Sequence, residues 1–196
     1  MAGSTHIPLR HLLTACTVIL AFLLAAPAAR ADCEGQALEQ PFAQWGDFAP
    51  YTLVGDGDLT GGGAGWDIDG ADLVADNEPW YVHGGDTPRA LRLRAGDSAT
   101  TPPMCVTLAH PTMRFFLRNR GGLLGALTVE VVMSNGLALP VGVVPGLLGD
   151  DDWNPSARFL VVGNLLDDEV SFRFTAGGLG GSYVIDDVYV DPYKKG

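Results

Sequence analysis

Short stretches of alternating apolar and polar residues run through most of this chain, and this period of two constrains the fold more than any other feature. Successive side chains of a β-strand point to opposite faces, so the pattern predicts half-buried strands. Turn-forming residues separate the stretches, and no 3.6-residue apolar period is sustained among them. This organisation predicts an all-β fold, an antiparallel β-sandwich or barrel. The clearest stretches are 90–96, 112–121, 125–136, 156–164, 169–178 and 181–190, and weaker ones are 51–54, 66–74, 79–83, 104–108 and 137–144.

Residues 1–31 differ from the rest, and we interpret them as a secretory signal peptide outside the fold. A basic start precedes a Leu- and Ala-rich run, and the final Ala-Arg-Ala has the small residues that signal peptidase recognises, which predicts cleavage before Asp32. The alternatives are a retained membrane anchor and a lipobox ending at Cys16. The break at Pro27 favours cleavage over an anchor, and Cys16 precedes most of the apolar run, which is atypical of a lipobox.

Cleavage would leave an N-terminal lead-in at 32–50 and one β-sandwich domain at 51–196. These 165 residues carry all 23 acidic residues and ten of the twelve basic ones, a formal charge of −13. Such an acidic surface repels phosphate backbones, so we expect no nucleic-acid partner. We expect a secreted, extracellular protein with no stable membrane insertion once the signal peptide is removed.

Two cysteines remain in the mature chain, Cys33 and Cys105. In an oxidising compartment two thiols most simply form one disulfide. Closing so long a loop would stabilise the fold by roughly 4 kcal/mol in the chain-entropy model. The bond would attach the N-terminal lead-in to the domain.

The two ends of the predicted domain resemble a known family. GDLTGGGAGWDIDGADLV (57–74) and YVIDDVYVDPY (183–193) are similar to the ends of jelly-roll domains of the galactose-binding-like, carbohydrate-binding-module type. HPTMRFFLRNRGG (110–122) with TVEVVMSNG (128–136) resembles a group of uncharacterised secreted bacterial proteins of similar length. The resemblance implies a jelly-roll β-sandwich, a fold that hosts many unrelated binding roles.

The same resemblance implies a structural calcium between the first and last strands. Related modules bind it with an acid of the first strand, an Asp of the IDD stretch and backbone carbonyls. Thr60 stands where those modules often have an acid. The matching ligands here are Asp56, Asp58, Asp186 and Asp187.

The stretch DGDLTGGGAGWD (56–67) also matches part of an EF-hand loop, whose positions 1, 3, 5, 6 and 12 require oxygen ligands and a turn glycine. Its flanks are strand-like, however, and Asp67 at position 12 reaches less far than glutamate. Three interpretations follow: an EF-hand, a jelly-roll calcium site, or a metal-free turn, of which we favour the turn. The matching residues are Asp56, Asp58, Thr60, Gly61 and Asp67.

Few residues offer catalytic chemistry, and we assign no catalytic residue. The mature chain contains no HExxH and no G-x-S-x-G motif, and its histidines are His83 and His110. Adjacent acids such as Asp151 and Asp152 are the remaining acid–base candidates. Pairs of this kind in polar loops are usually solvated turn residues. We therefore favour a binding protein over an enzyme.

Aromatic residues are the strongest indication of binding. Sugar-binding sandwiches stack pyranose rings on exposed Trp and Tyr faces, with polar neighbours for the hydroxyls. Trp80, Tyr81 and His83 form one candidate group, and Trp153 in the DDDWN loop is another. Each could instead anchor a loop or the core, which is the interpretation we favour for Trp45 and Trp66.

Arginines in the alternating stretches form a second candidate surface. Their apolar neighbours point inward, so the arginines lie on the opposite faces of their strands. On neighbouring strands they would bind a carboxylate- or sulfate-bearing ligand. We favour the alternative, in which they pair across strands with Glu130 and other acids. The residues are Arg92, Arg94, Arg114, Arg118 and Arg173.

Three functions remain, in this order. The first is a secreted, non-catalytic binding module for extracellular or cell-wall carbohydrate. The second is an accessory or structural cell-surface protein that engages other proteins, and the third is a hydrolase whose motif the sequence does not reveal. The calcium implied by the resemblance is the one cofactor considered.

Overall fold

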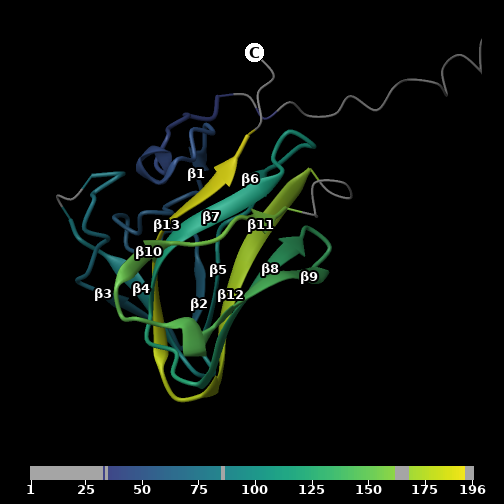
Figure 1. Cartoon of the computed structure of the whole chain (residues 1–196). Coiled ribbons are helices and arrows are strands. Elements are labelled where there is room, and N and C mark those ends of the chain that lie inside the picture. Colours follow the sequence, from purple (N-terminus) through teal and green to yellow (C-terminus); the bar gives the residue numbers. More distant parts are fainter. Residues whose placement is uncertain (1–32, 34, 85–86, 162–167, 193–196) are drawn as a thin grey trace, which may run out of the picture. The chain divides into compact units, whose positions relative to one another are not determined.

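The computed structural model describes residues 33, 35–84, 87–161 and 168–192, which form two antiparallel β-sheets packed face to face (Figure 1). The predicted antiparallel β-sandwich of jelly-roll type is confirmed. The signal peptide predicted for residues 1–31 lies outside the described residues. Within the described part of the chain, no helix has the length and apolar character needed to cross a bilayer.

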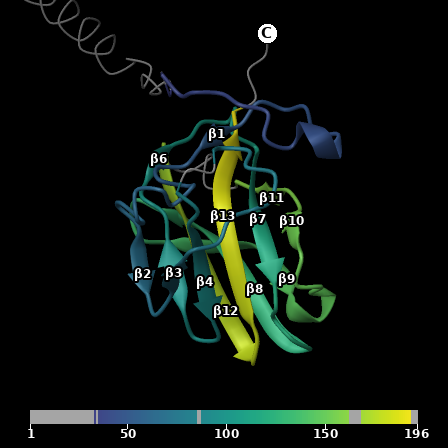
Figure 2. The same ribbon diagram turned by 90° about the vertical axis from the view of Figure 1, so that its left-hand side faces the viewer.

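The larger sheet has seven strands, in the order β10-β7-β13-β4-β3, with β1 also paired to β13 and β11 to β7. The C-terminal strand β13 thus lies in the middle, between β7 and β4 (Figure 2). The strands are β1 (Thr52–Leu53), β3 (Asp72–Val74), β4 (Ala90–Arg94), β7 (Thr112–Asn119), β10 (Trp153–Pro155), β11 (Phe159–Leu160) and β13 (Ser182–Asp191).

The smaller sheet has six strands, in the order β2-β5-β12-β8-β9, with β6 also paired to β12. β12 and β8 pair over ten residues and form its centre. Two short 3₁₀ helices, η1 (Ala43–Trp45) and η2 (Gly146–Leu148), complete the described elements. The strands are β2 (Asp67–Asp69), β5 (Ser98–Thr100), β6 (Met104–Cys105), β8 (Leu124–Met133), β9 (Ala138–Pro145) and β12 (Glu169–Leu179).

Several of the predicted strands differ from the structure. The stretch 66–74 forms two strands, β2 and β3, one in each sheet, and 104–108 contains only the two-residue β6. The stretch 79–83 forms turns and no strand, because the Glu78 carboxylate accepts hydrogen bonds from the backbone N–H groups of Trp80 and Val82 and folds the chain around itself. Within 156–164 the described strand is only β11, two residues long.

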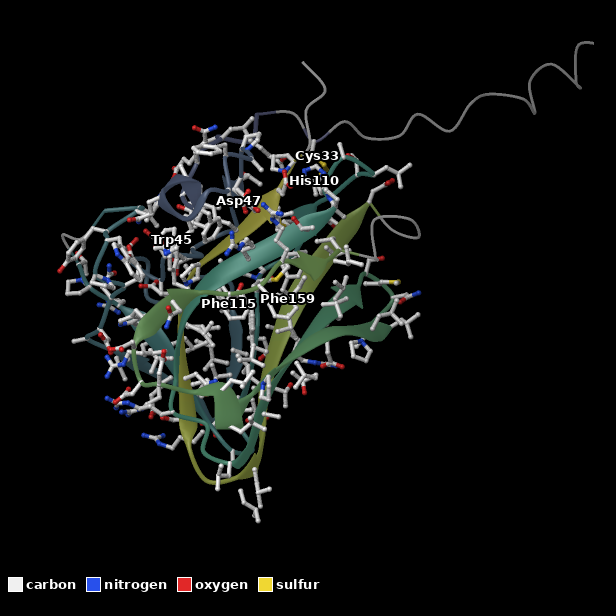
Figure 3. The ribbon with its side chains drawn as sticks, in the orientation of Figure 1. Cys33, Trp45, Asp47, His110, Phe115 and Phe159 are labelled. Atoms are coloured by element: carbon white, nitrogen blue, oxygen red, sulfur yellow. A yellow bond between two sulfur atoms is a disulfide. The ribbon has the colours of Figure 1, made fainter. Side chains whose placement is uncertain are left out.

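The main hydrophobic core lies between the sheets and contains the inward residues of the alternating strands. Phe115 of β7 stacks on Phe159 at a centroid distance of 5.7 Å and meets Phe174 of β12 edge-on at 5.0 Å (Figure 3). Trp66 belongs to this core, as predicted, and its indole N–H donates to the carbonyls of Gly55 and Asp56.

A second apolar cluster covers the outer face of the seven-stranded sheet; we call it the outer aromatic cluster. Phe42 from the N-terminal lead-in stacks on Phe116 of β7 at 5.1 Å. Alternation on β7 thus sends Phe115 to the core and Phe116 to the outer face. The lead-in is a structural layer of the domain. The cluster consists of Phe42, Tyr51, Phe116 and Tyr189, with Trp45, Ala49, Leu53, Trp80, Val82 and Trp153 packed against it.

The predicted disulfide is present. Cys33 and Cys105 are joined with a Cα–Cα distance of 5.6 Å across a separation of 72 residues. The bond attaches the start of the lead-in to β6 and so to the six-stranded sheet.

Candidate functional site

The outer face of the seven-stranded sheet carries a transverse row that ends in a tryptophan. Arg92 of β4 and Arg118 of β7 are both opposite Val184 of β13, and Trp153 of β10 is opposite Arg118. These residues therefore follow one another across four neighbouring strands. The strand alternation places them outward, away from the core between the sheets.

The arginines of this face are paired with carboxylates. Arg118 Nη1 lies 2.6 Å from Asp76, and its Nε lies 3.2 Å from Asp151. Arg92 and Arg94 share Asp72, at 3.1 and 2.6 Å. Such pairs present hydrogen-bond donors and acceptors side by side at the protein surface.

The fifth predicted arginine lies on the other sheet. Arg173 of β12 is opposite Glu130 of β8, and its Nε donates to the Glu130 carboxylate at 2.7 Å. The predicted cross-strand pairing with Glu130 is confirmed for this residue. Arg92, Arg94, Arg114 and Arg118 share the seven-stranded sheet, so the five do not form one surface.

Trp80 and Trp153 both pack against the outer aromatic cluster, and each remains partly exposed. Trp80 meets Trp45 edge-on at 4.7 Å and lies tilted over Phe116 at 5.7 Å. Arg118 is the next outward residue after Phe116 on β7. Hence two half-buried indoles accompany the Arg118–Asp76 ion pair on one face.

Glu78 positions the Trp80 loop, and sequence reasoning missed it. The residue is fully buried, and both of its carboxylate oxygens accept backbone N–H bonds of 2.6 Å, from Trp80 and Val82. Its own N–H donates to Asp186 of β13 at 3.4 Å. Tyr81, the residue after Trp80, has a φ of +51°, and its side chain is 57% exposed to solvent. An acid beside an apparent strand pattern gave no local signal of this role.

His83 does not belong to the arginine row. It lies among the acids Glu39, Asp58 and Asp187, which come from the lead-in, the 56–67 turn and β13. Its Nδ1 is 3.1 Å from the Glu39 carboxylate and its Nε2 is 4.0 Å from Asp58. Burial acts against the charged imidazole, but the Glu39 hydrogen bond and the charges of Glu39, Asp58 and Asp187 outweigh it and raise the pKa of His83. An open depression of ≈510 Å³ lies beside this histidine, with Glu39 and Val82 in its wall.

Two aspartates of β13 are buried in this region. Burial, with the charge of Asp187, raises the pKa of Asp186 to about 9. Burial and then the charge of Glu78 raise the pKa of Asp187 to about 7. Asp187 lies in the bulge of β13 with a φ of +50°.

Two of the residues that the family resemblance assigns to calcium, Asp56 and Asp58, make hydrogen bonds within their own turn. Both oxygens of Asp56 are used by the backbone N–H groups of Gly61 and Ala64, at 2.7 and 2.6 Å. Asp58 accepts the Thr60 hydroxyl at 2.9 Å. Among the described residues, no three His, Cys, Asp or Glu side chains are grouped so that they could hold a metal ion. The calcium site of Asp56, Asp58, Asp186 and Asp187 stays a prediction.

A buried ionic network attaches the lead-in to β7. Asp47 is 2.7 Å from Arg114 Nη1 and 2.7 Å from Arg158 Nη2, and it accepts the Tyr51 hydroxyl (Figure 3). Burial of Asp47 opposes its ionisation, but hydrogen bonds from Arg158, Tyr51 and Arg114 outweigh burial and lower its pKa to about 2. Arg114 also lies 4.3 Å over the Phe42 ring. This arginine therefore has a structural role.

No family model and no curated protein matches the chain. The structure is similar to several solved structures. A family 61 carbohydrate-binding module in complex with β-1,4-galactotriose matches with a TM-score of 0.47 and 17% identity, covering 71% of this chain and 97% of that chain. A carbohydrate-binding module from Cellvibrio mixtus lichenase 5A in complex with cellotriose has a TM-score of 0.44 and 14% identity, over 71% and 94%.

The enzymatically active domain of bacteriophage CBA120 tailspike protein 4 matches with a TM-score of 0.49 and 11% identity. The match covers 71% of this chain and 21% of that chain, so it spans about a fifth of the solved tailspike domain. At these identities and TM-scores, the ligands and activities named here are properties of those proteins and are not assigned to this chain.

Proposed function

We propose that this protein is a secreted, non-catalytic module that binds a neutral extracellular or cell-wall carbohydrate on the outer face of its seven-stranded sheet. The observation that carries the proposal is the placement of the Arg118–Asp76 ion pair beside the half-buried indoles of Trp80 and Trp153. Indole faces stack on pyranose C–H faces, and paired guanidinium and carboxylate groups serve sugar hydroxyls as donor and acceptor.

The charge pattern supports a neutral glycan over an anionic one. Arg118 has Asp76 and Asp151 as partners, and Arg92 and Arg94 share Asp72. A carboxylate or sulfate on the ligand would have to displace these acids, whereas a hydroxyl can bond to both members of a pair without displacing either.

The loop architecture supports a preformed surface. Glu78 fixes the backbone at Trp80 and at Val82, and the Asp76 carboxylate of the same loop is fixed by Arg118. A surface ordered before the ligand arrives loses less entropy on binding.

A glycan array with the wild type, Trp80→Ala and Trp153→Ala tests the proposal. We expect the wild type to bind a neutral oligosaccharide and each variant to lose about tenfold in affinity, since stacking of a ring of similar size, a nucleic-acid base, on an aromatic side chain contributes about 1–3 kcal/mol and 1.4 kcal/mol is tenfold. The unfolding midpoint of each variant identifies any that fail to fold, and Trp153→Phe, which keeps an aromatic ring, serves as the conservative replacement. Absence of glycan binding, or binding unaffected in folded variants, contradicts the proposal.

A second candidate function is an accessory surface protein that engages another protein. Exposed aromatic side chains favour it, with Phe48 69% and Tyr81 57% exposed, because aromatic residues are enriched in protein interfaces. Pull-down from the native cell envelope with the wild type and with a Phe48→Ala/Tyr81→Ala variant distinguishes the two functions. A reproducible protein partner that the variant loses favours this second function.

A further inference from the structure

Three segments made of glycine and leucine lie at one end of the sandwich, in or next to the connections between its strands. They are Gly121–Gly125 (GGLLG), which runs from the β7–β8 connection into the start of β8, Gly146–Gly149 (GLLG), which contains η2, and Gly177–Gly181 (GGLGG), which runs from the end of β12 into the β12–β13 turn. We call them together the leucine tip. The β7–β8 connection and the β12–β13 turn lie at the end of the sandwich remote from the C-terminal end of β13 (Figure 1).

The three segments are packed against one another through their backbones. Leu179 pairs with Leu124 at the last rung of the β12–β8 ladder. A Cβ atom added to Gly125 or Gly181 would collide with Gly121, and one added to Gly146 would collide with Gly122. Glycine is therefore required for this close approach, which leaves no room for the leucines between the segments.

The leucines of the tip are exposed to an unusual degree, between 60% and 83%. Isolated exposed apolar residues are ordinary in soluble proteins, but a contiguous group marks an interaction site. The values are 83% for Leu123, 65% for Leu124, 60% for Leu147, 69% for Leu148 and 74% for Leu179.

The composition of the tip identifies its partner. Within these fourteen residues no side chain can donate or accept a hydrogen bond or stack as an aromatic ring, so the tip does not suit a glycan. A stable protein interface uses about 20–30 residues a side, with aromatic or Arg anchors and about ten hydrogen bonds. The leucine tip is too small and too uniformly aliphatic for a stable dimer. A lipid surface needs only apolar side chains at the depth of the headgroups.

The surrounding charge narrows the lipid type. Asp150, Asp151 and Asp152 follow the GLLG segment directly, and the protein as a whole is strongly acidic. Anionic headgroups would repel such a surface. The glycine backbones also keep polar groups that require hydration, so insertion is limited to the headgroup region.

We propose that the leucine tip docks the protein shallowly onto zwitterionic lipid membranes. This inference does not depend on glycan binding, because none of the exposed leucines belongs to the row of Arg92, Arg118 and Trp153, although Asp151, which follows the GLLG segment, pairs with Arg118. Leu160 offers a matched control: it is 61% exposed, and it is opposite Thr112, at the end of β7 remote from the tip.

Co-sedimentation with vesicles tests the proposal, using the chain of residues 1–196, its Leu123→Ser/Leu147→Ser/Leu179→Ser variant and its Leu160→Ser variant. We expect the wild type and Leu160→Ser to bind phosphatidylcholine vesicles, and the triple variant to lose at least about tenfold, since one buried leucine contributes more than the 1.4 kcal/mol of a tenfold change. Adding phosphatidylglycerol should weaken binding. Equal binding by the wild type and the triple variant overturns the proposal.

A second measurement locates the contact and does not depend on whether residues 1–31 remain attached. We expect brominated phosphatidylcholine to quench the additional fluorescence of Leu179→Trp and not that of Leu160→Trp. Equal quenching, or no quenching, of both variants overturns the proposal. Self-association of the wild type that the triple variant abolishes, without lipid binding, would instead assign the tip to a second copy of the chain.

Discussion

Asp47 and Arg114 form a buried ion pair, with 2.7 Å between Oδ2 and Nη1, that joins the N-terminal lead-in to the middle of β7. The two side chains are only 4% and 11% exposed. The N-terminal lead-in that contains Asp47 also carries Trp45, whose ring contacts Trp80. The outer face of the seven-stranded sheet therefore depends on a residue from outside the predicted strands.

Asp47→Asn should lower the free energy of unfolding by about 3 kcal/mol, because it leaves the Arg114 charge buried and without its carboxylate. Urea unfolding at pH 7 measures the change. Glu130→Gln is the control: it breaks the more exposed Arg173 pair on the other sheet and should cost less than about 1 kcal/mol. Equal losses in the two variants would contradict the structural role of Asp47.

The same pair predicts acid sensitivity. The pKa of Asp47 is about 2 in the folded protein against the ordinary 3.8, so the folded state favours the ionised carboxylate. Its contribution of about 2 kcal/mol is present above pH 4 and is lost as the pH falls through 2. The stability difference between the wild type and Asp47→Asn should therefore shrink between pH 5 and pH 2. A difference that stays constant over this range would contradict the assignment.

The turn at 56–67 should hold without metal. The Asp56 carboxylate already fixes the backbone of Gly61 and Ala64, so we expect EDTA to leave the Tm unchanged and Asp56→Ala to lower it, with about 1–3 kcal/mol lost for two hydrogen bonds to a carboxylate. A fall in Tm with EDTA that calcium restores would instead establish the metal site predicted from the family resemblance.

Glu78→Gln should disorder the Trp80 loop. The amide nitrogen of glutamine is a donor and cannot accept the second backbone N–H, so one of the two 2.6 Å bonds is lost and two donors face each other. We expect a loss of about 1–3 kcal/mol and weaker glycan binding, which unfolding and binding measurements on the same samples would show. Unchanged glycan affinity in a folded Glu78→Gln variant would contradict the claim that the Trp80 loop is part of the binding surface.

Much of the fold was predictable because alternation is a local property. The period of two places Phe115 inward and Arg118 outward without knowledge of the neighbouring strands. The long strands β8, β12 and β13 could be located in this way to within two or three residues at either end. The disulfide was predictable because two cysteines admit one pairing.

The candidate site was less predictable because it depends on long-range register. Nothing local indicates that Arg118 faces Trp153 while Arg173 lies on the other sheet. The segment PWYVH (79–83) has the sequence pattern of a strand but forms turns, because hydrogen bonds to the side chain of Glu78, a residue outside the pattern, fix its backbone. Trp80 was expected at the surface, and its partial cover by Trp45 comes from the distant lead-in.

The central claim is tested most directly by a matched pair of arginine variants on a glycan array. Arg118→Gln and Arg173→Gln each remove one guanidinium that is paired with a carboxylate, on opposite sheets. The account predicts that the wild type and Arg173→Gln bind the same neutral glycan, whereas Arg118→Gln binds it at least about tenfold more weakly, as expected for a lost charged hydrogen bond. Equal binding by the two variants, or loss with Arg173→Gln alone, would contradict it.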